Sequence, residues 1–509
     1  MNGLPKEASE YIESLERQVE RLTELLRLSQ KARFGASSEK AKYVLADGAE
    51  QVCIFNEAEA VADETAAEPV IVERHTRKKK RTKEELAKTL PVKEVMIELP
   101  ENERVCGICE GELTPIGKEL VRRELSIIPA QAYVTETYRV NYACRQCQDE
   151  TDEANIVKAP VPEPVIKRGL ASPSAIAHVI YQKYVNSIPL DRQEKDWARF
   201  GVNISRATLA NWIIYVCKNW LIPLWFALKV VLLQSLVICS DDTVTQVLME
   251  PGKTPQSESR MWVYCTGNTG GPVVILYEYQ PNRSGENPKK FLEGAKNYYL
   301  QTDGYAGYNS VEGATHCGCW AHLRRKFEEA LPPQAAKKDS KAAEGLAYCQ
   351  QLFMLERKSE NMPPEERLKS RLEKSKPVLD AYFAWIETVN PLQGSKLAAA
   401  ITYSRNQREP LTAFLLDGHI EIFNNRIENH IRPFTLGRKN WLFADTVRGA
   451  QSSAVAYSII ETAKANGLNP YKYLLYLFTK LPSVLTKNPN ADLSAFFPWN
   501  EAVRAECGL

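Results

Sequence analysis

Two aspartates stand where a metal-dependent enzyme would need them. Asp241 follows the apolar run of residues 236–239, and Asp303 follows the strand-like run of residues 298–302. If these runs are neighbouring strands of one sheet, the two carboxylates lie close together, and one pKa is raised unless cations occupy the site. Such a pair suits Mg²⁺ or Mn²⁺, which prefer oxygen ligands. Two ions about 4 Å apart would activate an attacking oxygen and stabilise a leaving oxygen in phosphoryl transfer.

A third carboxylate is expected on a helix that follows the sheet. Glu428 is the candidate, with Asn424 one helical turn earlier on the same face. The interval between Asp303 and Glu428 is far longer than one helix and loop require. Glu409 and Glu421 therefore remain alternatives for the third position.

The elements that must hold these carboxylates predict an α/β fold. Strands are expected at residues 236–239, 261–266, 272–279, 298–302 and 315–319, with helices beginning near residues 288 and 321. This order is that of a ribonuclease-H-like sheet, with Asp241 on the first strand and Asp303 at the end of the fourth. Residues 326–415 are charged, helical in composition and nearly free of strand signals, which predicts an all-α insertion in the catalytic core.

Four cysteines form two C-x-x-C pairs that flank a strand-like segment. They are Cys106, Cys109, Cys144 and Cys147. Four thiolates at this spacing can surround one tetrahedral ion, so we expect one structural Zn²⁺. Unligated core cysteines and a redox pair are the alternatives, and two separate pairs in a cytosolic chain make both less favoured.

Residues 190–212 have the pattern of a helix-turn-helix. The segment DRQEKDWARF predicts the first helix, Gly201 lies in the turn, and Ser205 caps the second helix. The second helix would enter a major groove. The residues expected to read base edges are Arg206, Thr208 and Asn211. Short helical pairs also occur in α domains that do not bind DNA. The cysteine unit and the basic run at residues 74–83 nevertheless favour the helix-turn-helix interpretation.

Basic side chains near the carboxylates are candidates for contact with DNA phosphates, because guanidinium and ammonium groups pair with backbone oxygens. They are Arg324, Arg325, Lys326, Arg432, Arg438 and Lys439. A solvated helix face is the alternative. Cys319 and His322 form a Cys-x-x-His pattern that could contact metal or phosphate, although a packing pair at a strand–helix junction is favoured.

The amino-terminal region predicts a helix and a linker. Residues 9–31 carry apolar side chains at alternating steps of three and four, which indicates a short coiled coil or a single amphipathic helix. Residues 47–69 are acidic and rich in alanine, and the basic run follows, so this part reads as a flexible linker. Its alternative role is a phosphate-contacting arm.

Composition sets limits on the function. The 509 residues, 44% hydrophobic and 25% charged, predict a soluble globular protein of several domains. The net charge of +2 means that any DNA contact rests on local basic clusters. The apolar stretch at residues 220–239 is interrupted by Pro223, Lys229 and Gln234, so we expect a buried helix and strand and no membrane span. The first 30 residues lack a signal pattern, and a cytoplasmic protein is expected.

These motifs, in this order, resemble the insertion sequence 66 family of DDE transposases over almost the whole chain. The segments that carry the resemblance are ARFGASSEK, the Cys106 to Cys147 unit, IPLDRQEKDWARFGVNISRATLANW, LQTDGYAGYN, GCWAHLRRKF, NNRIENHIRP and GRKNWLF. The resemblance implies a catalytic triad of Asp241, Asp303 and Glu428. The family usually has Glu where this chain has Asp242, and Arg where it has Asn429. Asp241 is preferred over Asp242 as the first residue beyond the expected strand.

On this resemblance the protein is expected to bind the terminal inverted repeats of its element, cleave a strand and use the 3′-hydroxyl to attack target DNA. Its expected partners are double-stranded DNA of element ends and target, further copies of itself on DNA, and small accessory proteins of the same element. A non-catalytic repressor derived from a transposase is the alternative, but it should have lost at least one carboxylate. A ribonuclease-H-like nuclease would not need the upstream modules.

The expected organisation follows from these assignments. It comprises a zipper-like helix (1–45), a flexible linker (46–90), a zinc-binding domain (91–160), a helix-turn-helix region (161–230), a DDE catalytic domain (231–450) with its helical insertion (326–415), and a C-terminal helical region (451–509).

Overall fold

The computed structural model of the chain describes residue 120 and residues 131–144, 155–332 and 340–509. The chain divides into two units, residues 36–133 and the remainder, and nearly all described residues belong to the latter. The expected coiled coil, the linker, and Cys106, Cys109 and Cys147 lie outside the described residues.

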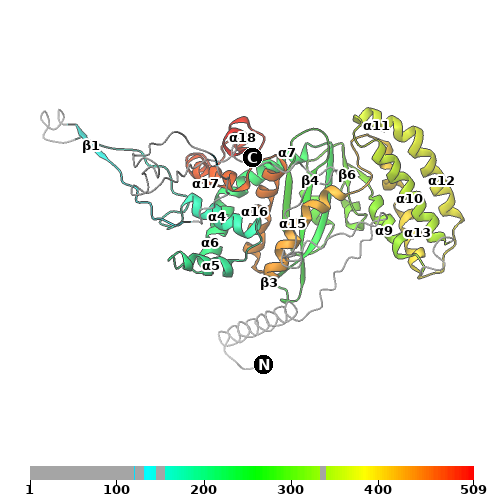
Figure 1. Cartoon of the computed structure of the whole chain (residues 1–509), viewed down its shortest axis with the longest axis horizontal. Coiled ribbons are helices and arrows are strands. Elements are labelled where there is room, and N and C mark those ends of the chain that lie inside the picture. The colour runs from blue at the N-terminus through cyan, green and yellow to red at the C-terminus, as the bar shows by residue number, and fades with distance from the viewer. Residues whose placement is uncertain (1–119, 121–130, 145–154, 333–339) are drawn as a thin grey trace, which may run out of the picture. The chain divides into compact units, whose positions relative to one another are not determined.

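A mixed sheet forms the centre of the larger unit (Figure 1). Its strands are β3 (Val237–Met249), β4 (Glu258–Thr266), β5 (Ile275–Gln280), β6 (Tyr298–Gln301), β7 (Ala314–Cys317) and β8 (Ala444–Thr446). The order is β5-β4-β3-β6-β7, and β8 pairs with β3. β4 runs antiparallel to β3 and β5, whereas β6 runs parallel to β3 and β7. The expected α/β fold, with its strands in the expected order, is confirmed at this level.

The largest error in a predicted strand boundary is at the end of β3. The expected strand ended before Asp241, but β3 continues through Asp241 to Met249. The reason is its long antiparallel pairing with β4, which extends from Ile238↔Thr266 to Gln246↔Glu258. A polar sequence can continue a strand when a neighbouring strand satisfies its backbone groups. Asp241 is therefore held within a strand.

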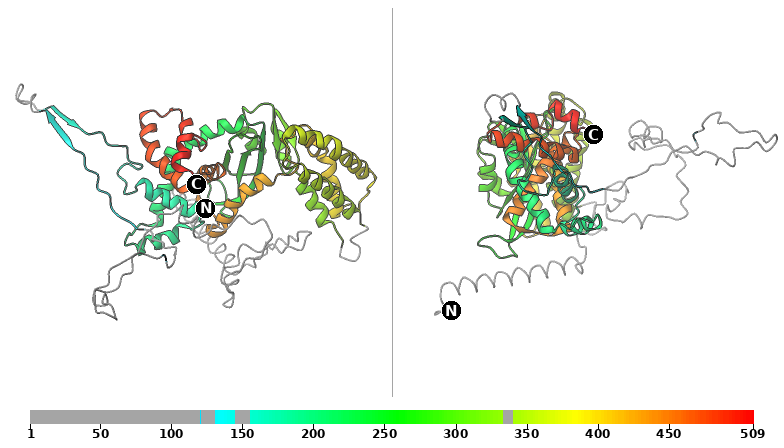
Figure 2. Two further views of the ribbon diagram at one scale, coloured as in Figure 1. Left: turned by 45° about the horizontal axis from the view of Figure 1, so that its top comes forward. Right: turned by 90° about the vertical axis from the view of Figure 1, so that its left-hand side faces the viewer.

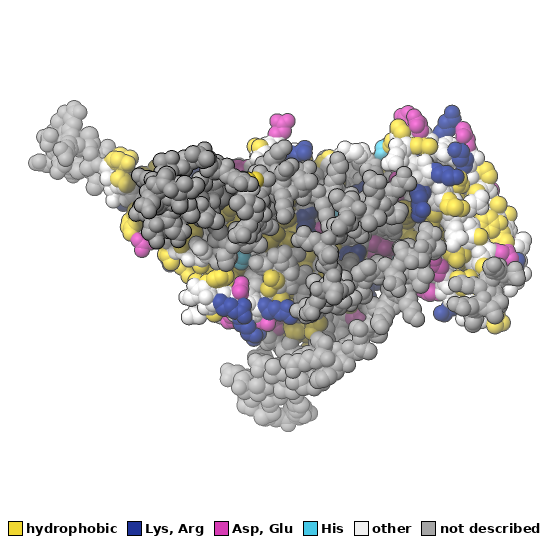
Figure 3. Space-filling view, in the orientation of Figure 1, with side chains coloured by type: hydrophobic (Ala, Val, Ile, Leu, Met, Phe, Trp, Pro, Cys, Tyr) yellow, Lys and Arg dark blue, Asp and Glu magenta, His cyan; other side chains and the backbone are white. Residues whose placement is uncertain are grey.

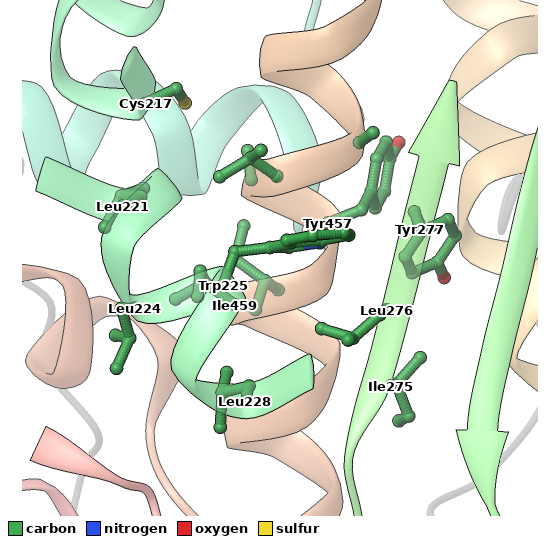
Figure 4. Packing of buried hydrophobic residues seen from close by; sticks show 14 of the residues in the cluster. Cys217, Leu221, Leu224, Trp225, Leu228, Ile275, Leu276, Tyr277, Tyr457 and Ile459 are labelled. Carbon is green, nitrogen blue, oxygen red and sulfur yellow. The ribbon is translucent and has the colours of Figure 1, made fainter. Parts of the chain in front are cut away.

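Helix α16 (Val447–Ala465) takes the place of a neighbouring strand at the free edge of β5. Ser458 and Thr462, one turn apart, accept hydrogen bonds from the backbone N–H groups of Tyr277 (2.8 Å) and Ile275 (3.0 Å). Trp225 of α7 (Ile222–Leu233) donates to the same Ser458 hydroxyl (3.1 Å). Figure 4 shows the apolar side chains of α7, α16 and β5 packed together. Covering an edge in this way prevents pairing with other chains.

Helices precede the sheet. They are α4 (Pro173–Tyr184), α5 (Leu190–Arg199), α6 (Arg206–Val216), the π-helix Cys217–Leu221 and α7. The stretch Arg206–Leu233 has the length and hydropathy of a membrane span, with 44% of its most apolar window buried. Its residues Cys217, Leu221 and Leu224 lie fully buried in the main core, which accounts for their apolar character. Two short strands, β1 (Asn141–Cys144) and β2 (Asn155–Lys158), pair with each other.

Between β7 and α15 (Asn425–Trp441) the described residues form helices and no strand, as the sequence predicted. They are α9 (Trp320–Glu329), α10 (Lys341–Lys358), α11 (Pro364–Ser370), the π-helix Arg371–Ser375, α12 (Lys376–Thr388), α13 (Lys396–Asn406), α14 (Arg408–Thr412) and the 3₁₀ turn Ala413–Leu415. These helices have their own hydrophobic core around Trp320, Phe327 and Tyr382. In the left view of Figure 2 they form a separate yellow-green to yellow bundle beside the sheet. Backbone hydrogen bonds join this part to the end of β7, from Gly318 to Pro410 and from Trp320 to Ile422.

The remaining elements are short or lie after α16. They are α8 (Glu286–Phe291), the 3₁₀ turn Ala306–Ser310, α17 (Pro470–Lys487), the 3₁₀ turn Ser494–Phe496 and α18 (Glu501–Cys507). Asn469 caps α17 by accepting a hydrogen bond from the N–H of Lys472 (3.1 Å), and Pro470 suits its first turn.

Candidate active site

Parallel pairing of β3 and β6 places Asp241 and Asp303 at equivalent positions. Cys239 pairs with Gln301, and each aspartate stands two residues further along its own chain. Residues two apart on a strand face the same side. Gly304 (φ +85°) turns the chain just after β6, and the N–H of Tyr305 returns to the Asp303 carboxylate (2.9 Å). The sequence-predicted pair is thus brought together where β6 ends beside β3.

Burial and the charge of Asp303 raise the pKa of Asp241 to about 8. The N–H of Asp242 donates to Asp241 Oδ1 (2.7 Å) and opposes this rise. A half-buried carboxylate beside a second one fits a divalent cation, because the cation offsets the cost of burying the charge and the repulsion between the two carboxylates. Over residues 131–144, 155–332 and 340–509, however, no three His, Cys, Asp or Glu side chains form a ready-made metal cluster.

Glu428 lies in the first turn of α15. Its charge also raises the pKa of Asp241, and its Oε1 is 3.8 Å from His322 Nε2. The carboxylate is about one-third exposed, at 36%. Glu428 therefore faces the same region as the two aspartates, on a separate element.

Asn424, immediately before α15, joins three elements of the site. Its side-chain amide donates to the carbonyl of Ser240 (3.2 Å), the residue before Asp241. Its backbone N–H donates to Cys319 Sγ (3.1 Å) at the start of α9. Asn424 is completely buried, so these bonds fix where the helix of Glu428 begins.

Gln301 gives a second connection between β6 and the segment before α15. Its side-chain amide donates to the carbonyl oxygens of Glu421 (2.5 Å) and Phe423 (3.1 Å). Gln301 is 1% exposed and is two residues from Asp303. Sequence reasoning missed this residue, although a polar side chain inside a buried apolar strand was a usable signal.

Asp242 is occupied by ion pairs. Its side chain is 1% exposed and lies 3.2 Å from Arg260 and 2.9 Å from Arg283. Although burial is the largest influence and raises the pKa of Asp242, both arginines oppose that rise. These ion pairs favour Asp241 over Asp242 as a metal ligand. The sequence had suggested the same choice for another reason, namely that Asp241 would be the first residue beyond the strand.

Cys319 and His322, the two residues of the Cys-x-x-His pattern, lie in different environments. Cys319 is buried, and burial raises the pKa of its thiol to about 11, so it serves as a packed hydrogen-bond acceptor for Asn424. His322 lies beside Glu428, and burial lowers its pKa. Cys319 thus has the packing role that was favoured, whereas His322 borders the carboxylates.

The basic residues predicted to contact phosphate lie in different surroundings. Arg324 pairs with Glu328 (2.8 Å), and the Lys326 ammonium is 5.0 Å from the Tyr403 ring centre. Arg438 donates to the carbonyl of Val244 on β3. Arg325 is half-buried, and Arg432 and Lys439 are exposed. Arg438 therefore has a structural partner already, and phosphate contact by this set stays a prediction.

The predicted recognition helix is α6. Ser205 accepts a hydrogen bond from the N–H of Thr208 (3.2 Å), as expected of its cap, and Gly201 has φ +81° in the preceding turn. Arg206, Thr208 and Asn211 are exposed. Leu209 and Trp212, on the other side of the helix, are buried. All three predicted base-reading residues are thus accessible to solvent on α6, although Arg206 lies about 160° around the helix from Thr208.

We expect Asp241→Asn to stabilise the metal-free fold at alkaline pH. Folding raises the pKa of this carboxyl from about 4 to about 8, so the group lowers stability progressively as pH rises through that window. The variant should therefore melt at the wild-type temperature near pH 4 and several degrees above it at pH 9, measured in chelator. A lower melting temperature for the variant at pH 9 would contradict the shift. Glu312→Gln, at an exposed site, is the control.

Family models of known proteins match four stretches of the chain. Residues 168–452 match the family described as "Transposase IS66 family", and residues 103–148 match "zinc-finger binding domain of transposase IS66". Residues 458–499 match "IS66 C-terminal element", and residues 21–95 match "Transposase C of IS166 homeodomain".

Relatives of similar length occur in Sinorhizobium fredii (strain NBRC 101917 / NGR234). The uncharacterized protein y4jD is 31% identical over 82% of this chain and 81% of its own length. The uncharacterized protein y4qI is 29% identical over 96% of this chain and 90% of its own length. Similarity therefore extends over most of both chains.

Proposed function

The chain belongs to the IS66 family of transposases, and we propose that it cleaves the ends of its own insertion sequence and joins them to target DNA. The family matches support a DNA-binding transposase with a zinc-finger region. The proposal adds the reaction and its residues: Asp241, Asp303 and Glu428 hold two Mg²⁺ or Mn²⁺ ions at the site of phosphoryl transfer.

A single observation carries the proposal. Asp241 and Asp303 each stand two residues beyond the last residue pair of the parallel strands β3 and β6, and Asn424 and Gln301 tie the helix of Glu428 to those same strands. The strand order β5-β4-β3-β6-β7, with only β4 reversed, supports a ribonuclease-H-like core. The two ions would activate the attacking oxygen and stabilise the leaving one.

The fold of the chain positions the three carboxylates. Asp241 is half-buried within β3 and Asp303 directly follows the end region of β6, so the sheet fixes the backbone from which both carboxylates extend. Glu428 approaches on α15, whose start is held by Asn424. Most of the organisation is thus built before substrate binds, which favours a reaction that depends on accurate alignment.

DNA contact is assigned to local surfaces. On the face shown in Figure 3, the described acidic and basic side chains are interspersed, in keeping with the net charge of +2. We assign base reading to Arg206, Thr208 and Asn211 on α6. Further copies of the chain on DNA and accessory proteins of the element belong to the proposal, as does action in the bacterial cytoplasm.

Substitution of Arg206 and Asn211 by Ala is expected to reduce the preference for element ends over random DNA at least about tenfold, because each base contact contributes about 1–3 kcal/mol. Competition binding at fixed salt measures the ratio. Equal weakening on both DNAs would mean that these side chains contact phosphates. Lys218→Ala, exposed beyond the end of α6, is the matched control.

The four cysteines are expected to hold one zinc per chain, as the matched zinc-finger family implies. Cys144→Ala should reduce zinc to well below one equivalent and weaken end binding, because a structural zinc stabilises a segment too small to fold well alone. Elemental analysis of purified protein checks this. An unchanged zinc content would remove Cys144 from the site. Cys349→Ala, buried among helices, is the control.

The whole function can be tested in cells. A marker flanked by the element's terminal repeats is supplied together with this protein and the other open reading frames of the element. Transposition of the marker into a target plasmid is expected with the wild-type chain and not with Asp303→Asn. Equal transposition with both chains would exclude the proposed site.

A further inference from the structure

Arg283 lies beside the carboxylates and has no role in the assignments above. It belongs to the loop between β5 and α8. Its Nε is 2.9 Å from Asp242 Oδ1, and its Nη2 is 3.6 Å from Asp303 Oδ2. The guanidinium thus bridges Asp242, which is not a metal ligand in our assignment, and Asp303, which is one.

Tyr305 fixes the guanidinium from a third side. The guanidinium carbon lies 4.0 Å from the centre of the Tyr305 ring, and the Tyr305 hydroxyl donates to the Arg283 carbonyl. The N–H of Tyr305 in turn donates to Asp303. A cation held against an aromatic face loses little freedom when it binds a ligand.

Asp242 is built to anchor this arginine. Its carboxylate is 1% exposed and is shared by Arg260 (3.2 Å) and Arg283. Arg260 also pairs with Glu258 (3.4 Å), whereas Arg283 places its positive charge 3.6 Å from Asp303. The side chain of Arg283 is 36% exposed, so that charge is open to a ligand.

The chemistry of the guanidinium indicates the ligand. It has five N–H donors in a planar fork, of which Asp242 and Asp303 engage only some. The fork matches the oxygens of a phosphate, and an arginine beside paired metal ligands stabilises charge that develops on a transferring phosphoryl group.

We propose that Arg283 is a catalytic residue that contacts a non-bridging oxygen of the DNA phosphate under attack, with Asp242 and Tyr305 as its positioning residues. This inference rests on the proposed function. In the cleavage step the oxygen of water bonds to phosphorus and the bond from phosphorus to the 3′ oxygen breaks. The 3′ oxygen takes up one proton, and the water loses one. Arg283 binds throughout and exchanges no proton.

The first test uses element-end DNA with one sulfur in place of a non-bridging oxygen at the cleaved phosphate. In the wild type, one stereoisomer should slow cleavage in a way that Mn²⁺ does not rescue. In Arg283→Gln, cleavage of normal DNA should fall about 100-fold, and the two stereoisomers should be cleaved at the same rate.

Further variants separate charge from position. Arg283→Lys should recover part of the rate, and Asp242→Asn should also cleave the two stereoisomers at the same rate. Lys289→Gln, which removes an exposed ion pair with Glu312, should behave as wild type.

A second readout needs no DNA. Arg283 puts a positive charge 3.6 Å from Asp303, so Arg283→Gln should bind Mn²⁺ several-fold more tightly in calorimetry, with an unchanged circular dichroism spectrum. An unchanged Mn²⁺ affinity, or wild-type cleavage with retained stereoisomer discrimination, would overturn the inference and leave the proposed function standing. A wild-type protein that cannot cleave would overturn both.

Discussion

Asp303→Asn should reduce both strand cleavage and strand transfer at least about 1,000-fold, while binding to element ends stays within about threefold. The carboxylate holds metal and not DNA in this account, and an in-line displacement loses most of its rate when the ions are misplaced. Asp241→Asn should fail alike, and burial of that carboxyl predicts a variant at least as stable as the wild type. Loss of activity there cannot then be ascribed to unfolding. Labelled end DNA, resolved on denaturing gels, gives both rates.

Glu428→Gln should show the same loss, and Glu421→Gln is its matched control. Glu421 already pairs with Arg426 (3.5 Å), and Glu409 is exposed on α14. The charge of Glu428, in contrast, acts on Asp241. Near-normal cleavage by Glu428→Gln together with an inactive Glu421→Gln would move the third carboxylate one segment earlier.

Gln301→Leu should slow cleavage by about 10- to 100-fold without touching any metal ligand. The substitution preserves most of the side-chain volume but leaves the part-buried carbonyls of Glu421 and Phe423 without their donor, which costs up to about 1–3 kcal/mol each. The segment before α15 should then shift and move Glu428 with it. The cleavage rate should fall because small displacements of groups near the reacting atoms have large effects on rate. Single-turnover cleavage at saturating DNA measures this.

Gln246→Leu is the matched control for Gln301. Gln246 lies on β3 and donates to the carbonyl of Pro255, at a distance along the strand from the carboxylates. It should lose stability without a comparable loss of cleavage. If Gln301→Leu cleaves as the wild type does, or if raised Mg²⁺ fully restores its rate, Gln301 does not position Glu428.

The sequence was sufficient for features that depend on local pattern. Apolar runs placed β3 through β7, and the residues between Cys319 and Asn424 formed helices where charged helical composition predicted them. Asp241 and Asp303 could be paired because the order of the elements predicted that their strands are neighbours in one sheet. The cap at Ser205 and the turn at Gly201 follow from the chemistry of those residue types.

Features that depend on distant partners could not be predicted. β3 extends through polar residues because β4 pairs with it, and no property of residues 241–249 alone shows that partner. Arg283 lies in a polar loop without periodicity, and its role depends on Asp242 and Tyr305 in other segments. Arg438 was predicted to contact DNA phosphate, but its guanidinium donates a hydrogen bond to a carbonyl on β3. Each of these follows from tertiary contacts that link residues far apart in the chain.

The most direct test of the central claim is cleavage of the element's own end DNA by purified protein with Mg²⁺ or Mn²⁺ as the only added cofactor. The account predicts a nick at the end of the terminal repeat with a free 3′-hydroxyl, which then appears joined to target DNA, and no product in chelator. A protein that binds the repeats specifically and leaves both strands intact in either metal would contradict the account and would be a non-catalytic DNA-binding protein.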